Sequence, residues 1–76
     1  MTKKIWITGA SSGIGKALAI KFAKEGWQVA ASARRKNLLN DLNSLNPNIH
    51  PFPLDVKNEN EAKNIFQNII EKFKTI

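Results

Sequence analysis

The sequence has 76 residues, 42% of them hydrophobic, which is enough for one small domain and too few for two. It has no cysteine and no apolar run of about 18 residues, which excludes disulfide bonds, cysteine-based metal sites and a membrane span, and favours a cytoplasmic protein. Twelve Lys and Arg residues against six Asp and Glu residues give a net charge of +6, which favours an anionic partner such as a nucleotide, a phosphate or a nucleic acid.

The chain opens with a predicted strand followed by a predicted helix. Residues 4–8 form a short β-branched and aromatic run, which is typical of a buried strand. Apolar residues then recur at helical spacing: Ile14, Ala17, Leu18 and Phe22. Gly26 follows as a stop signal, so we expect an amphipathic helix before this glycine, with the four residues on its apolar face.

A second strand and a second helix follow. Residues 27–33, WQVAASA, have the composition of a strand. Four leucines then mark a short helix: Leu38, Leu39, Leu42 and Leu45. We expect this helix to end at Asn46 and Pro47, because proline cannot continue it.

Residues 49–54, IHPFPL, predict a third strand at an edge of the sheet. Proline cannot donate to a strand ladder, and Pro51 and Pro53 have the same parity, so both turn the missing N–H toward the same side. The residues of the other parity can then pair with the second strand: His50, Phe52 and Leu54. Because parallel β-α-β units are right-handed, we expect the sheet order 3-2-1 with this strand outermost.

The last helix has the clearest pattern in the chain. Its apolar residues follow helical spacing: Ala62, Ile65, Phe66, Ile69, Ile70 and Phe73. Asn58 and Glu61 stand three residues apart at its start, which predicts a capping box with Asn58 as the N-cap. The elements therefore alternate as β-α-β-α-β-α, which favours an α/β fold with a parallel sheet and crossover helices.

The segment between the first strand and the first helix, TGASSGIG at residues 8–15, holds three of the four glycines. A glycine-rich turn at this place in an α/β fold binds phosphate through N–H groups and the positive end of the helix dipole. We expect Gly9 to permit the tight turn, Gly13 to let the backbone approach a pyrophosphate, and Gly15 to let the helix pack closely on the sheet. The glycine spacing matches neither the G-x-G-x-x-G fingerprint nor a Walker A loop, and a plain surface turn is the alternative.

TGASSGIG resembles the cofactor loop of the short-chain dehydrogenase/reductase family, whose pattern is TGxxxGxG. The resemblance extends along the chain through SARR at the end of the second strand, LDV at residues 54–56 and the last helix. It implies the N-terminal half of a Rossmann-type, doubly wound parallel sheet. It also implies hydride transfer between a nicotinamide dinucleotide and a carbonyl or alcohol.

The same resemblance implies roles for single residues in cofactor binding. Four residues of the loop would line the phosphates: Gly9, Ser11, Ser12 and Ile14. Asp55 would hydrogen-bond the adenine amino group, and Val56 would lie beside the adenine ring.

The residues after the second strand predict NADP(H) as the cofactor. An NAD-preferring enzyme has an Asp or Glu there, which accepts a hydrogen bond from the ribose 2′-hydroxyl. This sequence has Ala33 followed by Arg34 and Arg35, whose guanidinium groups can bind a 2′-phosphate by charge-assisted hydrogen bonds, and Ser12 can add a hydroxyl. A solvated charge run is the alternative, although a helix N-terminus disfavours cations unless an anion meets them.

The sequence has no tyrosine, whereas the family resemblance implies a catalytic Tyr-x-x-x-Lys motif. We therefore expect no catalytic residue in this chain and interpret residues 1–76 as an NADP(H)-binding half-domain that is inactive by itself, either a fragment of a longer enzyme or a truncated gene product. For the full-length enzyme we expect a small carbonyl or alcohol substrate and neither nucleic acid nor membrane as a partner, with a homo-oligomer left open.

Two alternatives belong to other function classes. One is a stand-alone nucleotide-binding module without catalytic activity. The other is a basic nucleic-acid binder, which only the net charge favours, because the basic residues are spread over several elements without a recognition motif.

Three further residues are expected to be structural. His50, the only histidine, has no cluster of partner residues, so we predict no metal site and a structural or exposed position. Trp6 and Trp27 lie in or at the start of predicted strands, where core packing is expected rather than stacking on nucleic-acid bases.

Overall fold

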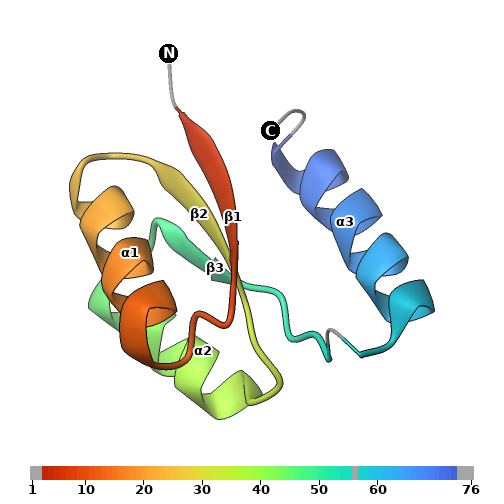
Figure 1. Cartoon of the computed structure of the whole chain (residues 1–76). Helices are drawn as coiled ribbons and strands as arrows, with labels where there is room; N and C mark the ends of the chain where they lie inside the picture. Colours follow the sequence, from red (N-terminus) through yellow and green to blue (C-terminus); the bar gives the residue numbers. More distant parts are fainter. Residues whose placement is uncertain (1–2, 56, 74–76) are drawn as a thin grey trace.

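The computed structural model describes residues 3–55 and 57–73, and strands alternate with helices along the chain (Figure 1). The elements in chain order are β1 (Lys4–Thr8), α1 (Gly13–Lys24), β2 (Gln28–Ser32), α2 (Lys36–Leu45), β3 (Ile49–Pro51) and α3 (Glu59–Phe73). This order confirms the predicted α/β arrangement. Within the described ranges, no helix is long and apolar enough to cross a membrane.

The three strands form one parallel sheet with β2 at its centre. Ile5 of β1 pairs with Val29 of β2, and Ala30 of β2 pairs with His50 of β3. The predicted sheet order 3-2-1 is therefore confirmed. α1 and α2 cover one face of the sheet and α3 covers the other (Figure 1), which is a doubly wound arrangement.

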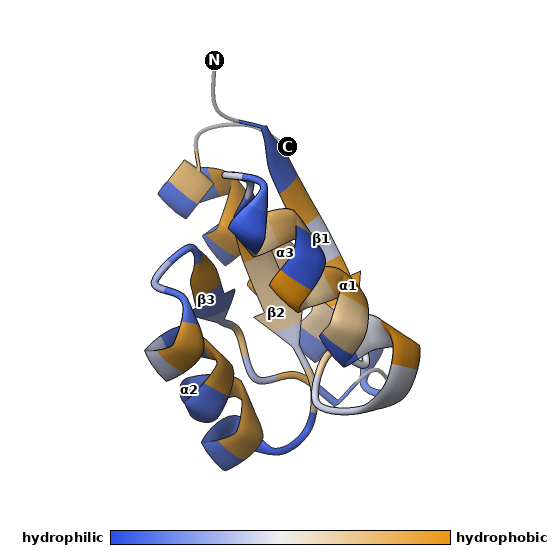
Figure 2. Ribbon diagram, turned by 90° about the vertical axis from the view of Figure 1, so that its left-hand side faces the viewer, coloured by the Kyte–Doolittle hydropathy of each residue, from blue (hydrophilic) through white to orange (hydrophobic). Residues whose placement is uncertain are grey.

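Each face of the sheet packs against its own helices. On the side of α1 and α2, one hydrophobic cluster joins these helices to all three strands: Ile7, Ala10, Ala19, Ala23, Val29, Ala31, Ala33, Leu39, Leu42 and Ile49. On the other side, a smaller cluster with its partly buried neighbours joins the sheet to α3: Ala30, Ile69, Phe73, Trp6, Phe52 and Ile65. The side chains of successive residues of β2 belong alternately to the two clusters. In Figure 2 most of this central strand has the tan and orange colours of apolar residues.

The two tryptophans lie on opposite faces of the sheet. Trp27 is half-buried against the cluster of α1 and α2, and its ring centroid is 4.7 Å from that of Phe22. Trp6 packs toward α3, where its ring centroid is 5.8 Å from that of Phe66. Its indole Nε1 donates a hydrogen bond of 2.8 Å to the hydroxyl of Ser32, which is fully buried. Both tryptophans thus pack between sheet and helices, as predicted.

α1 turns a different face to the sheet from the predicted one. The residues that it buries are Ala19 and Ala23. Ile14, by contrast, is 80% exposed, and Ala17 and Leu18 are exposed as well. The prediction that these three residues lie on the apolar face of the helix is therefore wrong, whereas the prediction for Phe22, which packs half-buried against the cluster, is confirmed.

The reason is the close approach of α1 to the end of β1. A Cβ atom on Gly15 would lie 2.9 Å from the carbonyl carbon of Gly9, and closer still to the carbonyl oxygen, so no side chain fits there. Gly15, Ala19 and Ala23 follow one another at four-residue spacing on this side of the helix. Small residues are thus selected where the helix approaches the sheet, and the predicted packing role of Gly15 is confirmed.

α2 differs from its prediction at one position. Leu39 and Leu42 are buried against the sheet, but Leu45 is 70% exposed. Leu45 is the last residue of the helix, and Asn46 follows as the C-cap with extended backbone angles, so Leu45 lies at the helix end and not over the sheet with the two buried leucines. The predicted end of the helix at Asn46 is confirmed.

β3 is shorter than predicted and ends at Pro51 instead of residue 54. Pro51 and Pro53 fix their own φ angles and restrict the residues before them, which limits the regular strand. The predicted pairing nevertheless continues beyond it, because the N–H groups of Phe52 and Leu54 each donate a hydrogen bond of 2.9 Å, to the carbonyls of Ala31 and Ala33. The proline parity therefore predicts the correct pairing side.

α3 begins with Asn58 as its cap, as predicted. The Oδ1 atom of Asn58 accepts a hydrogen bond of 3.1 Å from the N–H of Glu61. The second half of the predicted capping box is wrong, because the carboxylate of Glu61 accepts from the N–H of Asp55, at 3.3 Å, and not from the cap residue. The start of α3 is thereby tied to the segment that follows β3.

Candidate functional site

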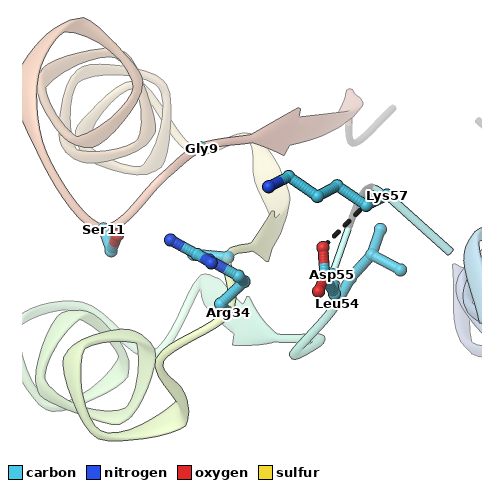
Figure 3. A pocket seen from close by; sticks show the side chains of 7 residues that line it. Gly9, Ser11, Arg34, Leu54, Asp55 and Lys57 are labelled. Carbon is cyan, nitrogen blue, oxygen red and sulfur yellow. Dashed lines mark hydrogen bonds between the residues drawn. The ribbon is translucent and has the colours of Figure 1, made fainter.

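The segments after the three parallel strands meet in a cleft of about 280 Å³ (Figure 3). The carboxyl ends of parallel strands lie at one edge of a sheet, which is where open α/β folds bind ligands. Seven residues line the cleft: Gly9, Ser11, Ala33, Arg34, Leu54, Asp55 and Lys57. Each of the three segments contributes at least two of them.

The turn between β1 and α1 is held against β2 by the backbone. The N–H of Ala10 donates a hydrogen bond of 3.0 Å to the carbonyl of Ser32, and Ala10 is fully buried. Gly9 has a φ angle of 65°, a conformation that side-chain-bearing residues rarely adopt. The predicted tight turn at Gly9 is therefore confirmed.

The N-terminus of α1 has features of an anion site. Ser12 is the N-cap residue with extended backbone, and its side chain makes no capping hydrogen bond. The first turn of the helix has no acidic residue. Gly13 has a φ angle of 60°, and a Cβ atom built on it would meet nothing within 4 Å. The first N–H groups of a helix have no intrahelical acceptor, so this open turn offers donors and positive potential to a phosphate.

Arg34 and Arg35 have different positions at the end of β2. Arg34 lines the cleft, and Figure 3 shows its side chain within it. Arg35 is the N-cap residue of α2 and is exposed, but it is not among the residues that line the cleft. The residue directly before this pair is Ala33, which places no carboxylate at this end of the strand.

Asp55 organises the other side of the cleft. Its Oδ1 atom accepts a hydrogen bond of 3.0 Å from the N–H of Lys57, and its carbonyl accepts one of 3.0 Å from the N–H of Asn58. An ionised carboxylate has about four lone-pair positions on two oxygens, so Asp55 retains capacity to accept a hydrogen bond from a ligand. The group is half-buried at the cleft wall.

The structure brings together most of the predicted site residues. Four of them line the cleft: Gly9, Ser11, Arg34 and Asp55. Four others form the cap and first turn of α1 beside it: Ser12, Gly13, Ile14 and Gly15. Arg35 lies next to the cleft lining, and Val56 lies outside the described residues. Lys57 is a lining residue that the sequence interpretation missed, and its only sequence signal is a positive charge shortly after the third strand.

His50 does not line this cleft. Its Nε2 atom lies 2.6 Å from Oε1 of Gln28, and its ring meets that of Phe73 edge to face at 5.2 Å. Burial, followed by the positive charge of Lys72, lowers the pKa of His50 from its ordinary value of 6.5. Its position is half-buried and structural. Among the described residues, no group of three or more His, Cys, Asp or Glu side chains could hold a metal ion.

Comparisons with known proteins agree with one another. The family model described as short chain dehydrogenase matches residues 3–76. The serine 3-dehydrogenase of Rhizobium radiobacter is 36% identical over 77 residues, which cover 100% of this chain and 31% of that protein.

Two solved structures have the same arrangement. A short-chain dehydrogenase from Streptomyces avermitilis superposes with a TM-score of 0.91 at 30% identity, over 96% of this chain and 27% of that one. The 3-ketoacyl-(acyl-carrier-protein) reductase from Brucella melitensis, complexed with NADH, superposes with a TM-score of 0.90 at 27% identity, over 97% of this chain and 31% of that one. The chain thus spans less than a third of the length of each of these three proteins.

Proposed function

The chain belongs to the short-chain dehydrogenase family, and from this membership we propose that it is the part of an NADP(H)-dependent oxidoreductase that binds the adenosine and pyrophosphate of the cofactor. For the whole protein we propose hydride transfer to or from a small carbonyl or alcohol substrate, the hydride chemistry being supplied by the bound nicotinamide. The observation that carries the choice of NADP(H) is the position of Arg34 in the cleft, directly after Ala33.

The pyrophosphate is assigned to the turn between β1 and α1. Gly9 turns the chain there, and Gly13 leaves open space above a backbone that has a positive φ angle. The hydroxyl groups of Ser11 and Ser12 and the first N–H groups of α1, including that of Ile14, would donate to the phosphate oxygens. Family membership and the open turn support this assignment.

The adenine is assigned to the side of the cleft formed by the segment after β3. Asp55 would accept a hydrogen bond from the adenine amino group with its remaining lone pairs. Val56 would lie beside the ring, and this role stays a prediction because Val56 lies outside the described residues. The N–H of Leu54 donates a hydrogen bond of 2.9 Å to the carbonyl of Ala33, which holds the segment after β3 next to the end of β2.

The 2′-phosphate is assigned to Arg34. A guanidinium group can hold a phosphate by two parallel charge-assisted hydrogen bonds, whereas a carboxylate at this place would repel it. A charge-assisted hydrogen bond contributes about 1.5–3 kcal/mol, which corresponds to roughly a tenfold to hundredfold preference. Arg35 is exposed beside the cleft and would add positive potential there.

Equilibrium binding of NADPH and NADH to the protein that carries this chain tests the proposal. We expect NADPH to bind at least about tenfold more tightly than NADH, and we expect Arg34→Asp to reduce or reverse this preference. Arg35→Asp makes the same charge change outside the cleft lining and should alter the preference less. Equal affinity of the unaltered protein for both dinucleotides would overturn the choice of NADP(H).

A nucleotide-binding module without catalysis is the second candidate, because the cleft and the open turn before α1 offer groups that would bind a nucleotide. Turnover distinguishes the two functions. NADPH-dependent reduction of a carbonyl compound by the protein that carries this chain supports the oxidoreductase, and tight NADPH binding without turnover supports the module. A cytoplasmic location and a homo-oligomer of the full-length enzyme both stay predictions.

A further inference from the structure

We propose that Lys57 is a further cofactor-binding residue, whose ammonium group pairs with the pyrophosphate from the β3 side of the cleft. The inference rests on the proposed function, because it takes the cleft to be the cofactor site. It concerns a residue to which neither the loop motif nor the family pattern assigned a role.

The position of the side chain carries the inference. Lys57 follows β3, yet it lines the same cleft as Gly9 and Ser11 of the turn before α1. Figure 3 shows the side chain of Lys57 extending from the segment after β3 in the direction of Gly9, so that its ammonium group is the part nearest to Gly9. A ligand held between the turn and Asp55 would therefore lie within reach of this charge.

The backbone of Lys57 is held in place at its base. Its N–H donates to Oδ1 of Asp55 at 3.0 Å, and the N–H of Asn58 donates to the carbonyl of Asp55 at 3.0 Å. Asn58 in turn caps α3 through the N–H of Glu61. The direction in which the lysine leaves the chain is thus fixed by a turn and a helix cap, which reduces the freedom lost when it binds a ligand.

The charges in the cleft favour the pyrophosphate as the partner of Lys57. A pyrophosphate diester carries two negative charges, and the N-terminus of α1 supplies only about half an elementary charge of the opposite sign. Arg34 is better suited to the terminal 2′-phosphate, because its planar fork matches phosphate oxygens in pairs. The lysine ammonium is a compact charge without this geometric demand, so it suits a diester whose oxygens also accept from the helix N–H groups.

The experiment compares NADPH, NADH and ADP as ligands of the unaltered protein and of Lys57→Met. NADH and ADP lack the 2′-phosphate, so a lysine that acts on the shared diphosphate must affect all three. We expect affinity to fall by about threefold to tenfold for each ligand, which is modest because the residue is exposed. Lys57→Arg keeps the charge and should stay within about twofold of the unaltered protein.

Lys63→Met is the matched control, because Lys63 is an exposed lysine of α3 that does not line the cleft. It should leave all three affinities unchanged, and circular dichroism melts should show that each variant keeps its fold. A loss confined to NADPH would place Lys57 at the 2′-phosphate and overturn the inference, as would no loss at all. An unaltered protein that binds none of the three ligands overturns the proposed function itself, a result distinct from either of these.

Discussion

Gly15 packs backbone to backbone against the carbonyl group of Gly9, at a place where a side-chain Cβ atom would lie 2.9 Å from the carbonyl carbon. The contact joins the first turn of α1 to the end of β1. It therefore sets the distance between the two arms of the turn to which we assign the pyrophosphate. A change in this contact would therefore alter both the stability of the fold and the shape of the site.

We expect Gly15→Ala to lower the free energy of unfolding by about 1–3 kcal/mol, the range for overpacking, because backbone atoms must move to admit the methyl group. Cofactor affinity should fall as well. Thermal melts and NADPH titrations measure the two effects. Lys21→Ala, an exposed position of the same helix, should change neither of them. A Gly15→Ala variant that melts like the unaltered protein would contradict the close contact.

Gly13→Val should abolish dinucleotide binding. The side chain would fill the open space beside a backbone whose φ angle is 60°, and a β-branched residue opposes that conformation. Gly26→Val is the matched control, because Gly26 also has a positive φ angle, 91°, and open space around it, but it follows the C-terminus of α1 and not the turn before this helix. Both variants should lose similar stability in thermal melts, and only Gly13→Val should lose NADPH binding. Undiminished binding by Gly13→Val would place the anion elsewhere.

The stability of the protein should depend on pH through His50. Burial, with a smaller contribution from the charge of Lys72, lowers the pKa of this imidazole below 6.5 in the folded state. As the pH falls below 6.5, the unfolded chain therefore takes up the proton first, and stability decreases until the lower folded pKa is reached. Above 6.5 both states are neutral at this group, and it contributes no pH dependence.

His50→Gln keeps an amide donor near Oε1 of Gln28 and removes the titrating group. Denaturant unfolding at about pH 7.5 and about pH 5.5 should show a smaller loss of stability for this variant than for the unaltered protein. Identical losses in the two proteins would show that the fold does not disfavour the charged imidazole.

A polypeptide of these 76 residues alone should form oligomers or soluble aggregates and should not reduce carbonyl compounds with NADPH. Within the described residues, β1 pairs with β2 on one side only, and a one-sided edge strand invites pairing with another chain. Four large apolar side chains among the described residues are also exposed: Ile14, Leu18, Leu45 and Phe66. Size-exclusion chromatography and a turnover assay test the two halves of this prediction. A monodisperse monomer with a cooperative melt would refute the first half, and measured turnover would refute the second.

The sequence predicts those features of the fold that depend on short-range chemistry. The proline parity in the third strand predicts that Phe52 and Leu54 pair with β2, because each proline removes a donor at a known position. The spacing of apolar residues in the last helix places Ile69 and Phe73 against the sheet. In both cases the decisive groups lie close together along the chain.

Features that depend on the approach of distant segments are harder to predict from the sequence. Apolar spacing predicts Ile14 and Leu18 on the core face of α1, but the contact between Gly15 and Gly9 favours small residues on the sheet side, which apolar spacing does not reveal. Lys57 belongs to no motif, and it enters the site only because the segment after β3 lies next to the turn before α1. Geometry in three dimensions, rather than residue type, makes it a lining residue.

The placement of the two tryptophans on opposite faces of the sheet gives the protein two separate optical probes. Trp27 lies on the side of α1 and α2, beside Phe22. Trp6 lies on the side of α3, and its indole N–H donates a hydrogen bond to the hydroxyl of Ser32. Indole emission depends on the polarity and mobility of its surroundings, so detachment of α3 would change the fluorescence of Trp6 and leave that of Trp27 as it was. Single-tryptophan variants would thus separate the unfolding of the two helical layers in one spectroscopic measurement.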